Sequence, residues 1–440
     1  MKTRDDISHA NRIIYTSVLF GAAYVTMTSS VIGVTLPDIM CLLGVDLKTC
    51  SSLLFAYGLG LCCSSLTGHF LKGKVDDPLF LAAVLVSNAV IIAAVPTSLF
   101  LWLTLTLMLL SGWCTGTCSF VGTLQCYVMW PNNAFGVFFM KSGASLSAII
   151  MPLVSNLFQN NHKGIDTDES FHNTTRTHPN PEQRCNGFNT NINYLYILMS
   201  GLGLLVAIAL MCCYNAFLKD GDVMELPLSR NRKPAEHRSL SKLFTSLMVC
   251  FAFTSSTCIA SFWELFVTYG IRTPLNLSLR DMSGMLSAFS CGIFLSRFAS
   301  VFLSARIRLD ALMLVYVVLT SVSSVLFLVF KDTSIMMMWT NCILYAIGLG
   351  PIYPGILAWL KEYSDGSPRV LNAVLLFYHA GFFISPTICG MIMDMSGADA
   401  FIYIVSGVGL FQCVLFLCLS YNNWKRTHVI TTSATKGLSD

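Results

Sequence analysis

The chain has 440 residues, of which 54% are hydrophobic and only 11% are charged. Because ordinary soluble domains carry about 25% charged residues, this composition excludes a typical water-soluble protein. The formal net charge of +4 is small and scattered. No basic stripe with interleaved aromatic residues indicates a nucleic-acid partner.

Long apolar runs follow one another along the whole chain, and a membrane-spanning helix needs about 20 such residues. The first run is too long for the apolar region of a signal peptide and is expected to remain as the first helix. The runs do not alternate in polarity, which favours helices over the strands of a membrane barrel. The predicted spans are 12–36, 49–71, 79–96, 99–128, 135–158, 193–217, 243–269, 281–303, 310–330, 334–360, 370–393 and 400–421.

A charged segment at 218–242 divides these spans into two sets of six. The predicted fold is therefore an all-α integral membrane protein with twelve transmembrane helices in two pseudo-symmetric six-helix halves. The first half covers 1–217 and contains one long polar loop at 159–193. The second half covers 243–421 and is followed by a tail at 422–440.

The distribution of Lys and Arg predicts the orientation. With both termini in the cytoplasm, 18 of the 27 basic residues fall in the termini and cytoplasmic loops, as the positive-inside rule requires. The glycosylation sequons at Asn173 and Asn276 then lie in external loops. The sequence therefore predicts a multi-pass glycoprotein, placed in the plasma membrane, with both termini inside.

The two halves repeat the same pattern of small and basic residues. Lys141 stands two residues before Gly143 in the fifth span, and His379 stands two residues before Gly381 in the eleventh. The fourth and tenth spans are both rich in glycine. Small residues allow helices to approach closely, so the matched positions predict two related six-helix units.

Ionisable residues inside spans are costly and are candidates for function. Glu264 could couple transport to a cation or bind a sugar hydroxyl, or it could be a hydrated carboxylate near the surface. Lys141 could line a pathway or extend to the headgroups, and His379 could relay protons or bond a neighbouring helix. Asp38 and Arg297 are predicted to act as helix-end, gating or ion-pair residues.

Neutral polar and aromatic side chains in the same spans could hold a sugar, which offers hydroxyls and apolar ring faces. Gln125 is the strongest of these candidates because a buried amide must find hydrogen-bond partners. The alternative for each is core packing. The candidate solute-binding residues are Ser119, Thr123, Gln125, Trp263, Asn341, Tyr345 and Tyr378, and Tyr269, Trp339 and Tyr353 are further aromatic side chains of these spans.

Several segments together resemble a known group of transporters. They are Leu36-Pro37-Asp38, Gly112 to Trp130, Gly143 to Leu153, Gly348 to Pro354, and Arg297 with Ser304-Ala305-Arg306. The chain resembles the sodium-dependent glucose transporter 1 group of the major facilitator superfamily and, more distantly, bacterial fucose permeases. The resemblance implies a hexose solute that is cotransported with a cation.

The chain departs from this group at positions that matter for coupling. The fourth helix of the group carries an Asp and an Asn near the position of Gly122, where this chain has Ser119 and Thr123. The fifth helix of the group carries a His where this chain has Lys141. These differences leave open a facilitator, or a carrier of an anion that pairs with Lys141.

The sequence thus predicts a monomeric secondary transporter of a small polar solute, with sugars first, partnered by sodium ions or protons and by the lipid bilayer. A small organic anion is the alternative solute, and a receptor or scaffold is the alternative role. An enzyme is not expected because no recognisable catalytic spacing occurs, and no P-loop indicates ATP hydrolysis. No cofactor or metal is expected, since the 17 cysteines mostly lie in apolar runs.

Overall fold

A computed structural model describes residues 4–26, 35, 39, 42–45, 47–71, 77–98, 100–131, 133–158, 192–218, 242–273, 279–331, 333–364 and 368–436 of the chain. Within them the regular structure is helical. The first half contains α1 (Arg4–Thr26), α3 (Leu47–Leu71), α4 (Asp77–Ala94), η1 (Val95–Thr97), α5 (Leu101–Met129), α6 (Phe135–Phe158), α8 (Ile192–Cys213) and η2 (Tyr214–Leu218). The second half contains α9 (Lys242–Arg272), α10 (Leu279–Leu303), α11 (Leu309–Phe330), α12 (Ile335–Leu349), α13 (Ile352–Ser364), α14 (Pro368–Ser396) and α15 (Ala400–Lys436).

Ten helical segments in the described residues are long and apolar enough to cross a membrane. They correspond to the third through the twelfth predicted spans. The second predicted span coincides with α3, whose apolar stretch is the shorter segment Ser52–Thr67. The first span corresponds in part to α1, which already begins at Arg4. Asp38, both sequons at Asn173 and Asn276, and most of the loop and linker lie outside the described residues.

The tenth predicted span coincides with the candidate membrane segment Ile335–Tyr363, which is interrupted near its middle. It breaks into α12 and α13 at Gly350 and Pro351, because proline has no N–H to continue the helical ladder. Gly350 is needed at this point, since a Cβ there would lie 2.3 Å from the Ser296 Oγ of α10. The carbonyl of Gly350 has no helical donor, because residue 354 is also a proline, and it accepts a hydrogen bond of 2.6 Å from Arg297 Nε.

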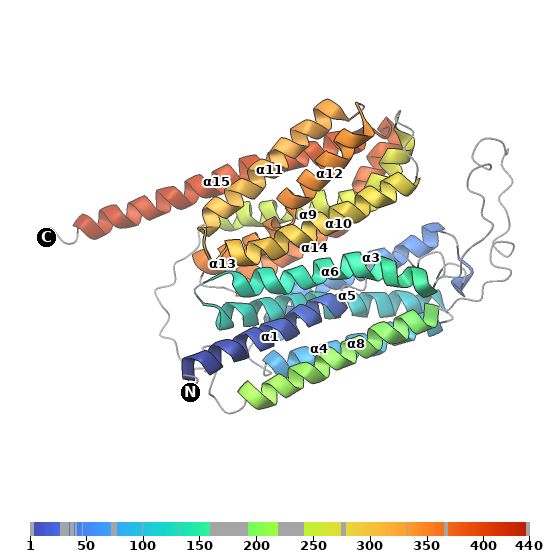
Figure 1. Cartoon of the computed structure of the whole chain (residues 1–440), viewed down its shortest axis with the longest axis horizontal. Helices are drawn as coiled ribbons and strands as arrows, with labels where there is room; N and C mark the ends of the chain where they lie inside the picture. Colours follow the sequence, from blue (N-terminus) through green and yellow to red (C-terminus); the bar gives the residue numbers. More distant parts are fainter. Residues whose placement is uncertain are drawn as a thin grey trace.

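The helices of each half contact one another in matching pairs. In the first half α3 packs on α5, α4 on α8 and α1 on α6; in the second half α10 packs on α12, α11 on α15 and α9 on α14. Between the halves, α6 lies beside α10 and α14 lies beside α3. Figure 1 shows the helices running roughly parallel, with α1 beginning and α15 ending at the same end.

Glycines make the same close approach in both halves. A Cβ on Gly143 would lie 2.3 Å from the Phe20 carbonyl oxygen of α1, and one on Gly381 would lie 2.2 Å from Ser256 Oγ of α9. These are the two glycines that the sequence aligns. The repeat therefore extends from the sequence to the contacts of the helices.

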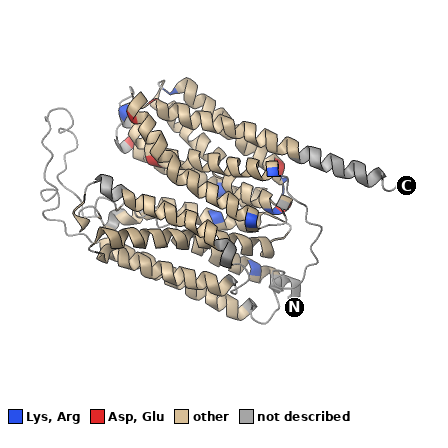
Figure 2. Ribbon diagram, turned by 180° about the vertical axis from the view of Figure 1, so that it is seen from behind, with Lys and Arg blue, Asp and Glu red and all other residues tan. Residues whose placement is uncertain are grey.

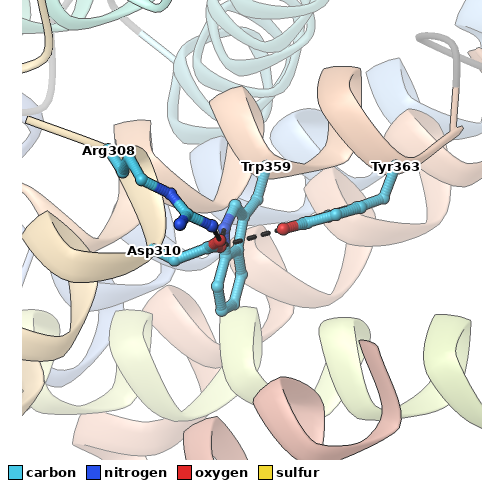
Figure 3. Close-up of polar contacts among 4 residues, drawn as sticks. All are labelled: Arg308, Asp310, Trp359 and Tyr363. Carbon is cyan, nitrogen blue, oxygen red and sulfur yellow. Dashed lines mark hydrogen bonds and ion pairs between the residues drawn. The ribbon is translucent and has the colours of Figure 1, made fainter. Parts of the chain in front are cut away.

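A partly buried contact centred on a carboxylate joins α11 to α13 (Figure 3). Asp310, at the start of α11, accepts hydrogen bonds from Trp359 Nε1 at 2.7 Å and from the Tyr363 hydroxyl at 2.9 Å. Arg308 Nη2 lies 3.7 Å from the other carboxylate oxygen, and its side chain is 88% exposed. The carboxylate thus holds two aromatic donors of α13 against α11.

Asp310→Ala is expected to lower the free energy of unfolding by about 2–4 kcal/mol. The reason is that hydrogen bonds to a charged group contribute about 1.5–3 kcal/mol each and that the Trp359 N–H would lose its acceptor. Arg308→Ala is the control and should change stability by less than about 1 kcal/mol, because exposed ion pairs are weak. Thermal unfolding of the purified protein, followed by tryptophan fluorescence, measures both, and equal losses would contradict the assignment.

Candidate functional site

A cavity lies between the two halves of the chain. Its volume is about 100 Å³. This is several times the roughly 10–15 Å³ that one water molecule needs on the same measure. Helices α1, α3, α5 and α6 line it from the first half and α9, α10, α13 and α14 from the second. The lining residues are Ala23, Thr26, Tyr57, Leu61, Thr115, Cys118, Ser119, Met140, Lys141, Ala144, Trp263, Arg297, Tyr353, Tyr378, His379 and Phe382.

The cavity brings together seven residues that the sequence singles out on six different helices. They are Ser119, Lys141, Trp263, Arg297, Tyr353, Tyr378 and His379. Two of them carry a fixed positive charge, and no Asp or Glu is among the described lining residues. Figure 2 shows ribbons that are almost wholly tan, with a few basic positions partway along helices.

Lys141 projects from α6 into the cavity and not toward the headgroups. It is only 5% exposed, and its Nζ donates to Ser119 Oγ of α5 at 2.5 Å. The same Nζ lies 5.3 Å from the centre of the Tyr353 ring, within cation–π distance. Its partners are therefore neutral, and its charge is solvated by a hydroxyl and an aromatic face.

Arg297 joins the two halves across the α6–α10 contact. Its Nη1 donates to Ser145 Oγ of α6 at 2.6 Å, while its Nε holds the Gly350 carbonyl at the helix break. A further hydrogen bond links it to Tyr378. The side chain is 5% exposed and, like Lys141, has neutral partners.

His379 lies at the other contact between the halves, where α14 meets α3. Its Nδ1 is 3.2 Å from the Leu61 carbonyl oxygen and 3.4 Å from Ser65 Oγ. A carbonyl can only accept, so this contact requires a proton on Nδ1. In the neutral ring Nε2 is then a hydrogen-bond acceptor.

Aromatic rings provide the flat surfaces of the cavity. The rings of Tyr353 and Tyr378 stack with centroids 3.7 Å apart. Trp263 donates from Nε1 to Ser290 Oγ at 3.2 Å and meets Phe382 edge to face at 5.9 Å. The cavity therefore combines a few polar groups with apolar faces, as small-molecule sites do.

Four predicted residues are buried away from the cavity. Gln125 accepts a hydrogen bond from the Tyr15 hydroxyl at 3.0 Å, and Thr123 donates to the Ser119 carbonyl at 2.6 Å. Asn341 accepts from Ser323 Oγ at 2.5 Å. Tyr345 belongs to an aromatic core with Phe262, Phe289 and Phe327.

Glu264 is also absent from the lining, and its side chain is exposed. Conversely, the cavity includes residues that the sequence did not single out, among them Thr26, Tyr57 and Thr115. Thr115 Oγ1 donates to the Thr26 carbonyl at 2.7 Å and so ties α5 to α1. Thr115 lies one helical turn before Ser119, so helical spacing from Ser119 could have identified it.

No protein-family model matches the chain. Two curated proteins of Danio rerio are similar over most of its length. The chain is 21% identical to Major facilitator superfamily domain-containing protein 4A, covering 97% of this chain and 90% of that protein. It is 22% identical to Sodium-dependent glucose transporter 1, covering 89% of this chain and 66% of that protein. The predicted resemblance is therefore confirmed.

Solved structures share the fold at low sequence identity. A crystal structure of the E. coli fucose:proton symporter FucP matches with a TM-score of 0.68 and 14% identity over 92% of this chain and 99% of its own. The proton:xylose symporter XylE bound to 6-bromo-6-deoxy-D-glucose matches at 0.67 and 12%, over 94% and 96%. The human organic anion transporter MFSD10 matches at 0.63 and 13%, over 94% and 100%. The chain thus has the fold of major facilitator transporters.

Proposed function

We propose that this chain is a secondary transporter that moves a small polar solute across a membrane by alternating access. Its twelve spans would form two six-helix halves, 1–217 and 243–421, joined by a cytoplasmic linker at 218–242. The observation that carries the proposal is the cavity lined by four helices from each half. Rocking of one half against the other would open this cavity to each side of the membrane in turn.

A hexose or related sugar is the first class of solute. Similar proteins include a sodium-dependent glucose transporter, a fucose symporter and a xylose symporter. The stacked Tyr353 and Tyr378 rings, with Trp263, could pack on a sugar ring. The Ser119 hydroxyl and the His379 ring could bond sugar hydroxyls.

A small organic anion is the second class of solute. The observation that favours it is the presence of Lys141 and Arg297 in the cavity without a carboxylate among the described lining residues. A human organic anion transporter is one of the proteins that share the fold. Both classes use the same cavity and the same alternating-access movement.

The orientation and location are part of the proposal. Both termini are assigned to the cytoplasm of a plasma-membrane protein, in keeping with the excess of Lys and Arg on that side. Asn173 and Asn276 are then external glycosylation sites. Helices α1 and α15 begin and end at the same end of the molecule, as an even number of spans requires (Figure 1).

Uptake into proteoliposomes tests the function. Saturable uptake of at least one labelled sugar or organic acid is expected, and Ala144→Trp, which would fill the cavity, should abolish it. A sodium or pH gradient applied to the same vesicles tests coupling. A folded protein that moves no solute but binds another protein through the 159–193 loop would instead support a receptor or scaffold.

Glu264 is the proposed coupling carboxylate. We expect Glu264→Gln to reduce gradient-driven accumulation at least about 10-fold, because a neutral amide cannot take up and release a cation. Counterflow of solute, which needs no driving ion, should persist. Glu362→Gln is the control, since Glu362 is an exposed carboxylate near the end of α13. Unchanged accumulation in Glu264→Gln would remove this residue from coupling.

A further inference from the structure

We infer that the solute carries a carboxylate, which binds between Lys141 and Arg297. The inference rests on the proposed transport function and specifies its substrate class. It covers small organic carboxylates with a compact ring or short apolar body, including sugar acids. Four observations support it. They are the lack of a counter-charge in the cavity, the unequal distribution of positive charge between the two contacts of the halves, the N–H donors of Arg297 and Lys141, and the apolar remainder of the lining.

The first observation is the missing counter-charge. Ion pairs in the described part of the chain include Arg272–Asp394, Arg308–Asp310 and Lys331–Asp399, and these three lie outside the cavity lining. Lys141 and Arg297 are each 5% exposed and bonded to hydroxyl, carbonyl and aromatic groups. Placing cations in a low-dielectric site without an anion is costly. A bound anion would supply the charge that the described lining lacks.

The second observation comes from the internal repeat. Gly116 of α5 faces Ser64 Oγ and the Leu61 carbonyl of α3, and Gly350 faces Ser296 Oγ and the Ile293 carbonyl of α10. This correspondence aligns Leu61 with Ile293, and Ser64 with Ser296.

The next residues in the two segments are Ser65 and Arg297, and they therefore occupy equivalent positions. Their partners at the contacts between the halves are also related. Ser65 lies against His379, whereas Arg297 lies on the side of α6 that carries Lys141, the residue aligned with His379. The fixed positive charge is thus concentrated at the α6–α10 contact, although the fold offers two equivalent contacts. A purely structural role for these two cations would not require both of them at the same contact between the halves.

The third observation is the set of available donors. Arg297 has five N–H donors, and its bonds to the Gly350 carbonyl, Ser145 and Tyr378 use three of them. A guanidinium is planar and matches the two oxygens of a carboxylate. Lys141 adds a point charge with three donors, of which the bond to Ser119 needs one.

The fourth observation is the remainder of the lining. Tyr353, Tyr378, Trp263 and Phe382 offer aromatic faces, and Leu61, Met140 and Ala144 are apolar. A bare inorganic anion would leave these surfaces unused. An organic carboxylate would place its charge on the cations and its body on the rings.

Matched pairs of anionic and neutral solutes test the inference. The probes are glucuronate with glucose, succinate with succinamide, and hippurate with hippuramide. Uptake into proteoliposomes and thermal stabilisation of the purified protein are both measured. We expect at least one carboxylate to be preferred to its neutral counterpart by about 10-fold or more, the ratio that a charged hydrogen bond supplies.

The variant for this test is Lys141→Gln. It should reduce the carboxylate preference about 10- to 100-fold, since a hydrogen bond to a charged group is worth about 1.5–3 kcal/mol. Lys141→Arg should restore part of it. Arg272→Gln is the control, because Arg272 belongs to an exposed ion pair at the end of α9. A structural role for Lys141 would lower uptake of both members of a pair and leave their ratio unchanged.

The outcomes separate this inference from the proposed function. Equal or preferred uptake of the neutral members, or a ratio insensitive to Lys141→Gln, overturns the carboxylate assignment and leaves transport intact. Absence of uptake and of stabilisation with all of these probes, together with no uptake of the wider sugar and organic-acid panel, overturns both.

Discussion

Gly112→Ala is expected to destabilise the protein by about 1–3 kcal/mol or more, although alanine ordinarily favours a helix over glycine. A Cβ on Gly112 of α5 would lie 2.0 Å from the Tyr57 carbonyl oxygen of α3. The same close approach occurs from the other helix, because a Cβ on Gly60 of α3 would lie 2.0 Å from the Leu109 carbonyl oxygen of α5. Both obstacles are backbone atoms, so the methyl group could be accommodated only if the two helices moved apart.

Gly201→Ala is the matched control for this packing. Gly201 lies within α8, and a Cβ there would meet nothing within 4 Å. Because alanine costs less backbone entropy, this variant should be neutral or stabilised by up to about 1 kcal/mol. Thermal unfolding in detergent measures both variants. Equal stability of the two would contradict the close α3–α5 contact.

We expect Lys361→Met to shift the equilibrium between the two conformations of the alternating-access cycle about 10-fold or more. The favoured conformation would be the one that is open at the end of the molecule where α13 bonds to the end of α5. Lys361 Nζ of α13 donates to the Trp130 carbonyl at the end of α5. It also lies 5.9 Å from the centre of the Tyr127 ring, and the Tyr127 hydroxyl donates to the Leu357 carbonyl at 2.5 Å. These bonds join the two halves at the end where α1 begins, since His9 of α1 packs on Trp130.

The size of this effect follows from the contacts that must break. Hydrogen bonds of a charged donor contribute about 1.5–3 kcal/mol, and the bonds exist only while this end is closed. By the predicted orientation the closed end is cytoplasmic. Spin labels at the exposed positions Pro131 and Glu362, on the two sides of the contact, would report its opening as a longer distance.

Lys331→Met is the matched control for this contact. Lys331 also has an oxygen acceptor and an aromatic ring nearby, namely Asp399 and the Tyr403 ring at 5.2 Å, but both belong to the second half. Its loss should reduce stability without changing the distance between the labels. If the distance distribution in Lys361→Met were identical to that of the unaltered protein, the contact would not be what holds this end closed.

The helices themselves could be predicted closely from the sequence because their signal is local. A span is a continuous apolar run, and its length is set by the thickness of the bilayer. The break of the helix at Gly350 is harder to predict from the sequence. Pro351 marks a possible bend, but the division into α12 and α13 also depends on Arg297, which takes the freed carbonyl. That partner is 53 residues away in the chain.

The candidate site could be predicted only in part, and Ser119 and Gln125 explain why. Both are polar residues of α5, and the sequence ranked Gln125 higher. Their separation along the helix corresponds to about one and two thirds of a turn, so the two side chains point in different directions. Ser119 therefore lines the cavity, while Gln125 turns to Tyr15 in the core.

By itself the sequence determined the membrane class, the position of the helices and the repeat that relates Lys141 to His379, because apolar run length and residue spacing are properties of the chain alone. The tertiary structure decided which polar residues meet. Arg297 and Lys141 come to one cavity because α6 and α10 pack together across the halves. Contacts between distant helices depend on how each helix is rotated about its axis, and no local pattern specifies that rotation.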